Sequence, residues 1–356
     1  MNALLFPGQG SQLIGMGSEF YNNYELVKKI FKLADEKLGF SISKIILEGP
    51  SDDLQLTKNT QPAILTVSYS IFKVLKEEFD FDFKSFSFFS GHSLGEYSAL
   101  VSSESLDFED AVYLLHERGK AMQNAVPIGK GSMLAVLGLE TVEIQNLIDN
   151  VKNKIEVCEI ANDNALGQVI ISGNKKCVET IQNILKEKKV KTIPLKVSAP
   201  FHCSLMKKAS EDMTEKISNT SFKKPLFKII NNVDAKVEMD PSKIKKKLID
   251  QIFSTVKWRE SIIFMEKSGV KNFIEIGPGK TLCGMVKRTV KDVNCFPINS
   301  IVDIKNLLNE FKKCGYDVFH KLLNAYDFGL PQNRDRLFIV GIQKKYNANW
   351  HIITLS

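Results

Sequence analysis

The sequence predicts an α/β fold with a mainly parallel sheet and a smaller domain inserted into a larger one. Short apolar runs alternate with stretches of helical periodicity along most of the 356 residues. Two of these runs, Leu4–Phe6 and Asn272–Ile276, are predicted strands that lead directly into glycine-containing turns. Between about 130 and 198 the predicted order of elements changes, which indicates the insertion.

The larger domain is predicted from residues 1–129 and 199–310. Helical periodicity covers about 23–38 and 61–79, and a short aromatic strand, Phe86–Phe89, leads into a glycine-flanked serine and a further helix. Hydrophobic residues make up 44% of the chain and charged residues 25%, which is ordinary for a globular protein.

The inserted domain is predicted over residues 130–198. Its pattern is strand, helix, strand, strand, helix, strand, the order of a ferredoxin-like unit. The predicted elements are Met133–Leu137, Val142–Val151, Ile155–Ile160, Gln168–Ser172, Lys175–Lys188 and Val190–Leu195.

Composition excludes several classes of protein. No apolar run is long enough to cross a bilayer, and the first residues lack the basic start of a signal peptide, so we expect a cytoplasmic protein with no membrane partner. The six cysteines include no Cys-x-x-Cys pair, which argues against a zinc site or a disulfide framework and predicts free, mostly buried thiols.

The formal charge of +7 is concentrated at the end of the chain. Residues 311–356 hold seven Lys/Arg and three Asp/Glu, whereas the rest holds 41 and 38. The charge therefore does not predict a nucleic-acid partner for the main body.

A candidate nucleophile lies between the aromatic strand and the following helix. Gly91-His92-Ser93-Leu94-Gly95 matches the Gly-x-Ser-x-Gly nucleophile elbow, which lifts a serine hydroxyl above the sheet edge of α/β-hydrolase-like folds. Its glycines are needed because side chains there would clash. The helix start beside Ser93 also brings backbone N–H groups towards a developing oxyanion.

A serine hydroxyl needs a base, and the chain has five histidines. His92 adjoins the serine and should point elsewhere, His116 lies in a helical stretch where a structural role is expected, and two others belong to the C-terminal segment. His202 lies where the chain returns from the inserted domain to the larger one and could face a cleft, although a loop histidine without this role fits the same pattern.

Two further features could contact a substrate. The loop around Gln9 follows the first strand, and because Leu13 replaces the third glycine of a dinucleotide fingerprint, a backbone N–H donor to an oxyanion is the better interpretation. Arg118 lies on a predicted helix. It is either a surface residue or, if the substrate carries a carboxylate, its bidentate partner.

Together these motifs resemble the malonyl-CoA:acyl carrier protein transacylases. The resemblance runs in order from residue 3 to about 310. It rests on Phe6-Pro7-Gly8-Gln9-Gly10-Ser11-Gln12, Gly91-His92-Ser93-Leu94-Gly95-Glu96-Tyr97, Asn162-Asp163-Asn164-Ala165-Leu166-Gly167-Gln168, Phe201-His202-Cys203 and Glu275-Ile276-Gly277-Pro278-Gly279-Lys280.

The resemblance implies a role for each matching residue. Ser93 would attack the malonyl thioester with His202 as base and then acid, and the backbone N–H groups of Gln9 and Leu94 would form the oxyanion hole. Arg118 would bind the malonyl carboxylate, and the carbonyl oxygen of Gln251 would orient the histidine in place of an Asp. The partners implied are malonyl-CoA and an acyl carrier protein, in a ping-pong reaction for fatty acid synthesis. No bound cofactor or metal is expected, and we expect a monomer.

In related polyketide acyltransferases, a Phe at the position of Phe201 accompanies malonyl rather than methylmalonyl specificity. The inserted domain would close the cleft against water.

The segment 311–356 resembles a different family. Residues 323–341, with Gln332-Asn333-Arg334-Asp335-Arg336 at their centre, are similar to the Gln-x-Arg-x-Arg region of the DNA (cytosine-5) methyltransferases, over about 311–347. The cofactor loop, the Pro-Cys nucleophile and the catalytic Glu segment of that family are missing, so a joined fragment is the favoured interpretation. We expect poor packing of its apolar strand, Leu337–Val340, for want of sheet neighbours.

Three alternatives remain beside the transacylase. A serine hydrolase or thioesterase could use the same elbow, as could an acyltransferase of a polyketide pathway. A DNA-associated module would depend on the C-terminal segment alone, where two arginines and a few lysines give only weak attraction.

Overall fold

The computed structural model describes residues 1–151, 156–195, 197, 199–313, 316–324 and 335–343. Its centre is a six-stranded sheet in the order β10-β9-β1-β2-β7-β8, in which only β8 is antiparallel to its neighbour. The predicted α/β fold with a mainly parallel sheet is therefore confirmed. The strands are β1 (Asn2–Phe6), β2 (Phe86–Gly91), β7 (Lys228–Ile230), β8 (Val237–Glu238), β9 (Asn272–Ile276) and β10 (Asn294–Ile298).

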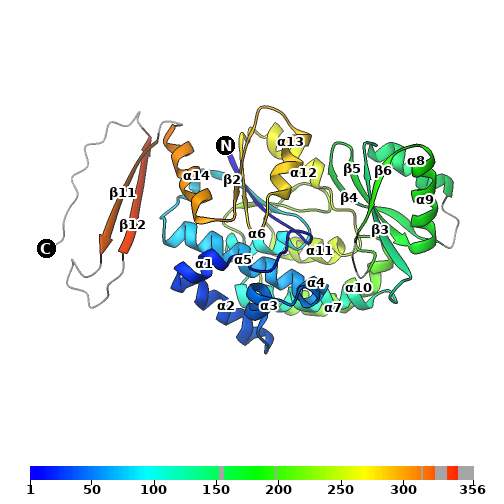
Figure 1. Ribbon diagram of the computed structural model, residues 1–356, viewed down its shortest axis with the longest axis horizontal. Coiled ribbons are helices and arrows are strands. Elements are labelled where there is room, and N and C mark those ends of the chain that lie inside the picture. The colour runs from blue at the N-terminus through cyan, green and yellow to red at the C-terminus, as the bar shows by residue number, and fades with distance from the viewer. Residues whose placement is uncertain (152–155, 196, 198, 314–315, 325–334, 344–356) are drawn as a thin grey trace.

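The two central strands are buried on both faces, as parallel strands covered by helices are. Every residue of β1 is buried, and so are all but Ser87 in β2. Helices lie on both sides of this sheet (Figure 1). They are α1 (Ser18–Asn23), α2 (Glu25–Leu38), α3 (Ile42–Glu48), α4 (Ser51–Gln55), α5 (Thr57–Glu77), α6 (Gly95–Ser102), α7 (Phe108–Asn124), α10 (Lys207–Asn219), α11 (Pro241–Gln251), α12 (Trp258–Lys267), α13 (Thr281–Thr289) and α14 (Ile301–Lys313), with short 3-10 turns at Phe83–Ser85 and Ser204–Met206.

Helix α5 starts at Thr57, four residues earlier than the periodicity predicts. Pro62 has no N–H to donate to the carbonyl of Lys58 within the helix. The Nδ1 of His116 on α7 bonds that carbonyl instead, at 2.8 Å. His116 thus stabilises the first turn of α5, which is the structural role expected for it.

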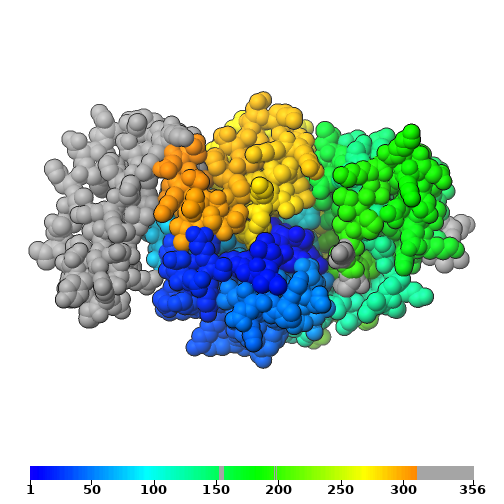
Figure 2. Space-filling model, viewed as in Figure 1, coloured from blue at the N-terminus to red at the C-terminus, as the bar shows by residue number. Residues whose placement is uncertain are grey.

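A second, antiparallel sheet lies at one end of the molecule, where Figure 2 shows it with its helices as a separate lobe (green). Its order is β4-β5-β3-β6, formed by β3 (Gly131–Leu137), β4 (Cys158–Ala165), β5 (Gln168–Asn174) and β6 (Lys191–Pro194), with helices α8 (Thr141–Val151) and α9 (Lys175–Glu187). The predicted succession of strands and helices is confirmed.

Strand β4 differs from its prediction, because it runs on to Ala165 instead of ending at Ile160. The polar residues Asn162, Asp163 and Asn164 are buried in it. Their backbone is held by the large body: Asp163 N–H donates to the Val256 carbonyl at 3.0 Å, and Val256 N–H to that of Ala161 at 2.9 Å. The same residues pair with β5 on their other side, so tertiary pairing keeps polar residues in the strand, contrary to the prediction from the sequence.

The C-terminal segment forms a third sheet. Strands β11 (Tyr316–Asn324) and β12 (Asp335–Gln343) pair antiparallel with each other, and within the described chain neither pairs with another strand. Helix α14 ends at Lys313, so it runs across the predicted boundary between residues 310 and 311.

The cysteines and the lengths of the apolar helices bear on the expectations from composition. Cys158, Cys177, Cys203 and Cys283 are buried and Cys295 is half-buried, and none of these five described cysteines forms a disulfide; Cys314 lies outside the described residues. Among the residues that the structure describes, no helix is both long and apolar enough to cross a bilayer.

Candidate active site

Ser93 lies in a tight turn between β2 and α6. Its φ of 52° is in the left-handed region, which is strained for a residue with a side chain. A Cβ added at Gly91 would lie 1.9 Å from the carbonyl group of Gly95, and one at Gly95 would lie 2.3 Å from the carbonyl oxygen of Phe6. The predicted need for both glycines is therefore confirmed: only they let the backbone turn sharply enough to present Ser93.

His202 contacts the serine hydroxyl directly. Its Nε2 lies 2.8 Å from the Oγ of Ser93, and its Nδ1 lies 2.9 Å from the carbonyl oxygen of Gln251, at the end of α11. A carbonyl oxygen only accepts, so Nδ1 carries the proton and Nε2 offers its lone pair to the serine O–H. Burial, and next the charge of Arg118, lower the pKa of His202 to about 3, so the resting imidazole is neutral. The structure thus brings the predicted histidine and serine together, with the unprotonated ring nitrogen facing the serine hydroxyl.

Arg118 reaches the same point from α7 and is only 1% exposed. One guanidinium nitrogen donates to Gln61 Oε1 at 2.7 Å; the other donates to Ser93 Oγ at 3.2 Å and to Gln251 Oε1 at 2.9 Å. Within the described chain it forms no ion pair, and burial lowers its pKa. A buried cation beside a nucleophile, held by neutral groups, is suited to an anionic substrate group.

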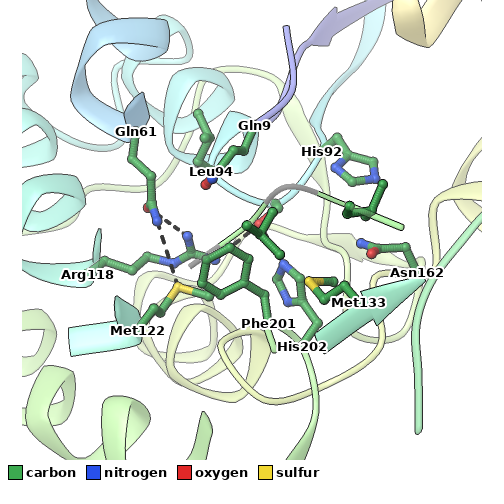
Figure 3. Close-up of a pocket in the computed structure, with 13 residues that line it drawn as sticks. Gln9, Gln61, His92, Leu94, Arg118, Met122, Met133, Asn162, Phe201 and His202 are labelled. Carbon is green, nitrogen blue, oxygen red and sulfur yellow. Dashed lines mark hydrogen bonds between the residues drawn. The ribbon is translucent and has the colours of Figure 1, made fainter. Parts of the chain in front are cut away.

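The pocket beside Ser93 has a volume of about 90 Å³ and lies between the two larger sheets. Figure 3 shows Arg118 extending into it from the side of Gln61 and Met122, with His202 and Phe201 opposite.

Gln9 and Leu94 line this pocket as well. Their backbone N–H groups have no hydrogen-bond partner within the part of the chain that the structure describes. The Gln9 loop lies against the elbow, because a Cβ at Gly8 would lie 2.6 Å from the carbonyl oxygen of His92. Both N–H groups are thus available to an oxygen beside Ser93.

His92 points away from the nucleophile, as expected. Its Nε2 lies 2.8 Å from Oδ1 of Asn164 on β4, and its ring packs edge-on against Trp258. The bond joins the elbow to the smaller lobe.

Sequence reasoning missed three residues that hold the site together. Asn232, just after β7, accepts from Ser93 N–H at 2.7 Å and donates to the Gly91 carbonyl at 2.8 Å through its amide. Glu96, on the first turn of α6, is 2% exposed and accepts from Asn232 N–H and from the Gln251 side chain. Gln61 holds Arg118. The available signal for Asn232 was its place after an apolar strand, where parallel sheets carry functional side chains.

Among the described residues, no three His, Cys, Asp or Glu side chains gather as a metal site would require. One imidazole and one guanidinium contact the Ser93 hydroxyl, a set suited to acyl transfer through the serine.

Comparison with known proteins identifies the family. The family model described as acyl transferase domain matches residues 3–320. The malonyl CoA-acyl carrier protein transacylase of Bacillus subtilis is 42% identical over 312 residues, covering 87% of this chain and 97% of that protein. This chain belongs to the malonyl CoA-acyl carrier protein transacylase family. The Haemophilus influenzae transacylase is 41% identical over 310 residues, covering 87% and 98%.

Solved transacylase structures share the fold. An acyl-carrier-protein-S-malonyltransferase from Bartonella henselae superposes with a TM-score of 0.84 at 38% identity, covering 87% of this chain and 99% of that one. A malonyl-transacylase solved in complex with its type II polyketide acyl-carrier protein gives 0.83 at 36% identity, covering 87% and 99%.

A second family model, C-5 cytosine-specific DNA methylase, matches residues 299–355. The predicted resemblance of the C-terminal segment is therefore confirmed. It overlaps the acyl transferase match over residues 299–320, which include all of α14.

Proposed function

We propose that this protein transfers the malonyl group of malonyl-CoA to the phosphopantetheine thiol of an acyl carrier protein. The observation that carries the proposal is that His202 Nε2 and a guanidinium nitrogen of Arg118 both lie within 3.2 Å of the Ser93 hydroxyl oxygen. The relatives' names support the malonyl donor and the carrier-protein acceptor, and the relative solved with its carrier protein supports that partner.

In the first half-reaction, His202 Nε2 takes the proton of Ser93 as its oxygen attacks the thioester carbonyl. The N–H groups of Gln9 and Leu94 bind the resulting oxyanion. The imidazolium then gives its proton to the departing thiolate of coenzyme A, which leaves a malonyl ester on Ser93. The carrier thiol reverses these steps and collects the malonyl group.

Arg118 selects the diacid in this scheme. Its nitrogen 3.2 Å from Ser93 Oγ can exchange that neutral contact for the malonyl carboxylate, since the carboxylate lies only one methylene from the reacting carbonyl. Phe201 faces the same pocket and is 6% exposed, which supports a preference for malonyl over the bulkier methylmalonyl.

The finer description of the fold is also proposed. The body 1–129 with 199–310 is α/β-hydrolase-like, and its elbow between β2 and α6 supports this. The lobe 130–198 is ferredoxin-like, supported by its strand order and paired helices. We regard 311–356 as a separate segment, and the protein as a cytoplasmic monomer with no resident cofactor.

The acceptor distinguishes this function from the thioesterase alternative. The protein is incubated with malonyl-CoA, with and without an acyl carrier protein bearing phosphopantetheine. We expect coenzyme A release to be limited to one acylation of the enzyme without the carrier and to become catalytic with it. Rapid, carrier-independent release would support a hydrolase instead.

A further inference from the structure

Glu96 is a buried carboxyl group that the reaction described above does not use. It follows the elbow on α6 and is 2% exposed. One of its oxygens, Oε2, accepts both from the backbone N–H of Asn232 at 3.0 Å and from the side chain of Gln251 at 2.7 Å. Both bonds end on the same oxygen, so the other oxygen can be changed chemically without breaking either bond.

Gln251 connects Glu96 to the reactive groups. Its Nε2 donates to Glu96, its Oε1 accepts from Arg118 at 2.9 Å, and its backbone carbonyl orients His202. A single amide group therefore separates the Glu96 carboxylate from the Arg118 guanidinium. Asn232 completes the set, because it carries the contact from Glu96 to the N–H of Ser93.

The charges around Glu96 are few. Arg118 faces it from α7 without an ion-pair partner in the described chain, and its guanidinium carbon lies 6.0 Å from the ring centre of Tyr97. The carboxylate of Asp234, after β7, raises the pKa of Glu96. Asp234 itself forms an ion pair with Lys247 at 2.7 Å. Ionised Glu96 is thus a carboxylate whose charge acts against that of Arg118.

We propose that Glu96 is a positioning residue that limits how tightly Arg118 binds the substrate carboxylate. This inference rests on the proposed function. An ionised Glu96 repels the malonyl carboxylate while it holds, through Gln251, the guanidinium that binds it. A looser hold suits a transferase, because a malonyl ester bound too tightly would be slow to pass to the second thiol.

Loss of the Glu96 charge should strengthen substrate binding, whereas a substitution that merely damaged the site would weaken it. Removing the Glu96 charge should tighten malonyl-CoA binding by roughly tenfold, for charges about 10 Å apart at an effective dielectric constant near 20. Acetyl-CoA has no carboxylate and should bind with unchanged affinity.

Burial raises the pKa of Glu96 to about 7, against the lowering effects of the bonds from Asn232 and Gln251 and the charge of Arg118. Below this pH the neutral carboxyl no longer repels the substrate. Malonyl-CoA should therefore bind more weakly as pH rises from 6 to 8, whereas the affinity for acetyl-CoA should not change over this range.

The test measures dissociation constants calorimetrically in the non-reacting variant Ser93→Ala, alone and combined with Glu96→Gln. Glutamine keeps an oxygen for both N–H groups but has no charge. We expect the double variant to bind malonyl-CoA about tenfold more tightly at pH 8 and to lose the difference in pH response between malonyl-CoA and acetyl-CoA.

Glu275→Gln is the matched control. Glu275 is also fully buried, its two oxygens accept separately from the N–H groups of Leu282 and Cys283, and neither of these bonds reaches the groups around Ser93. The amide of glutamine would face one of these N–H groups. This variant should therefore lower the melting temperature and leave both dissociation constants unchanged.

Equal malonyl-CoA affinity with and without Glu96→Gln, or weaker affinity in the double variant, would overturn the inference. If that variant does not fold, a flat malonyl-CoA affinity between pH 6 and 8 in Ser93→Ala alone would overturn it equally. These results would not affect the proposed function, which fails instead if wild-type protein forms no malonyl ester on Ser93.

Discussion

The region around Ser93 and the C-terminal hairpin match two different families and differ in how much structure surrounds each match. Side chains from α7 and from the loop before α10 meet at the Ser93 hydroxyl in the β2–α6 turn, and a backbone carbonyl of α11 orients His202. Strands β11 and β12, in the described chain, pair only with each other. The acyl transferase match covers residues 3–320, whereas the methylase match covers 299–355. A sequence match indicates a function only when all the elements that supply the site's side chains are present in the chain.

The two regions also contrast in stability terms. The sheet around β1 and β2 is buried on both faces, whereas an isolated two-stranded hairpin is marginal in water. Changes near Ser93 should therefore alter chemistry strongly, and removal of the hairpin should alter little.

The largest effect is expected from His202→Ala. Loss of the base that contacts Ser93 Oγ should slow acylation by about 10²–10⁴-fold, the usual contribution of general base catalysis. His116→Ala is the matched control. It should keep the acylation rate and lower the free energy of unfolding by about 1–3 kcal/mol, since the Lys58 carbonyl loses its partner. Quenched-flow assays measure the acylation rate, and denaturation measures the free energy of unfolding. Similar acylation rates in both variants would contradict the assignment of His202 as the base.

A smaller, more specific effect is expected from Arg118→Ala. Hydrogen bonds to charged groups contribute about 1.5–3 kcal/mol, so the preference for malonyl-CoA over acetyl-CoA should fall by roughly 10–100-fold. Ser93 should stay reactive towards acetyl-CoA. Arg288→Ala, which removes a single bond to Gln168 on the surface, should leave the preference as it is. Unchanged selectivity in Arg118→Ala would remove this residue from the carboxylate site.

The smallest effect is expected from deleting residues 314–356, which keeps all of α14. Transfer to the carrier protein should persist, and the unfolding free energy should change by less than about 0.5 kcal/mol, as for surface changes. Loss of transfer would show that the hairpin belongs to the enzyme, and the contrast between the two regions would no longer hold.

Local patterns in the sequence predicted the parts of the site that are local. The elbow is contained in five residues, and its glycines are required by contacts within the turn and with the adjacent strand β1. His202 could be proposed by elimination among five histidines, but its bond to Ser93 joins residues 109 positions apart.

Long-range polar contacts could not be predicted. Asn232 and Glu96 meet across 136 positions, and neither stands in a recognisable pattern with the other. The same applies to β4, whose polar end pairs both with β5 and with the backbone of Val256, which is distant in the sequence. Such groups are buried because a distant partner satisfies their hydrogen bonds, and that partner is visible only in the folded chain.

Mass spectrometry of the Ser93 peptide after incubation with malonyl-CoA tests the central claim most directly. We expect a malonyl adduct on this peptide, its loss when a carrier protein with free phosphopantetheine is added, and its absence in Ser93→Ala. Ser98→Ala, which changes a buried serine on α6 that does not line the pocket, should retain the adduct. An intact, folded wild-type protein that carries no malonyl group on Ser93 would contradict the mechanism.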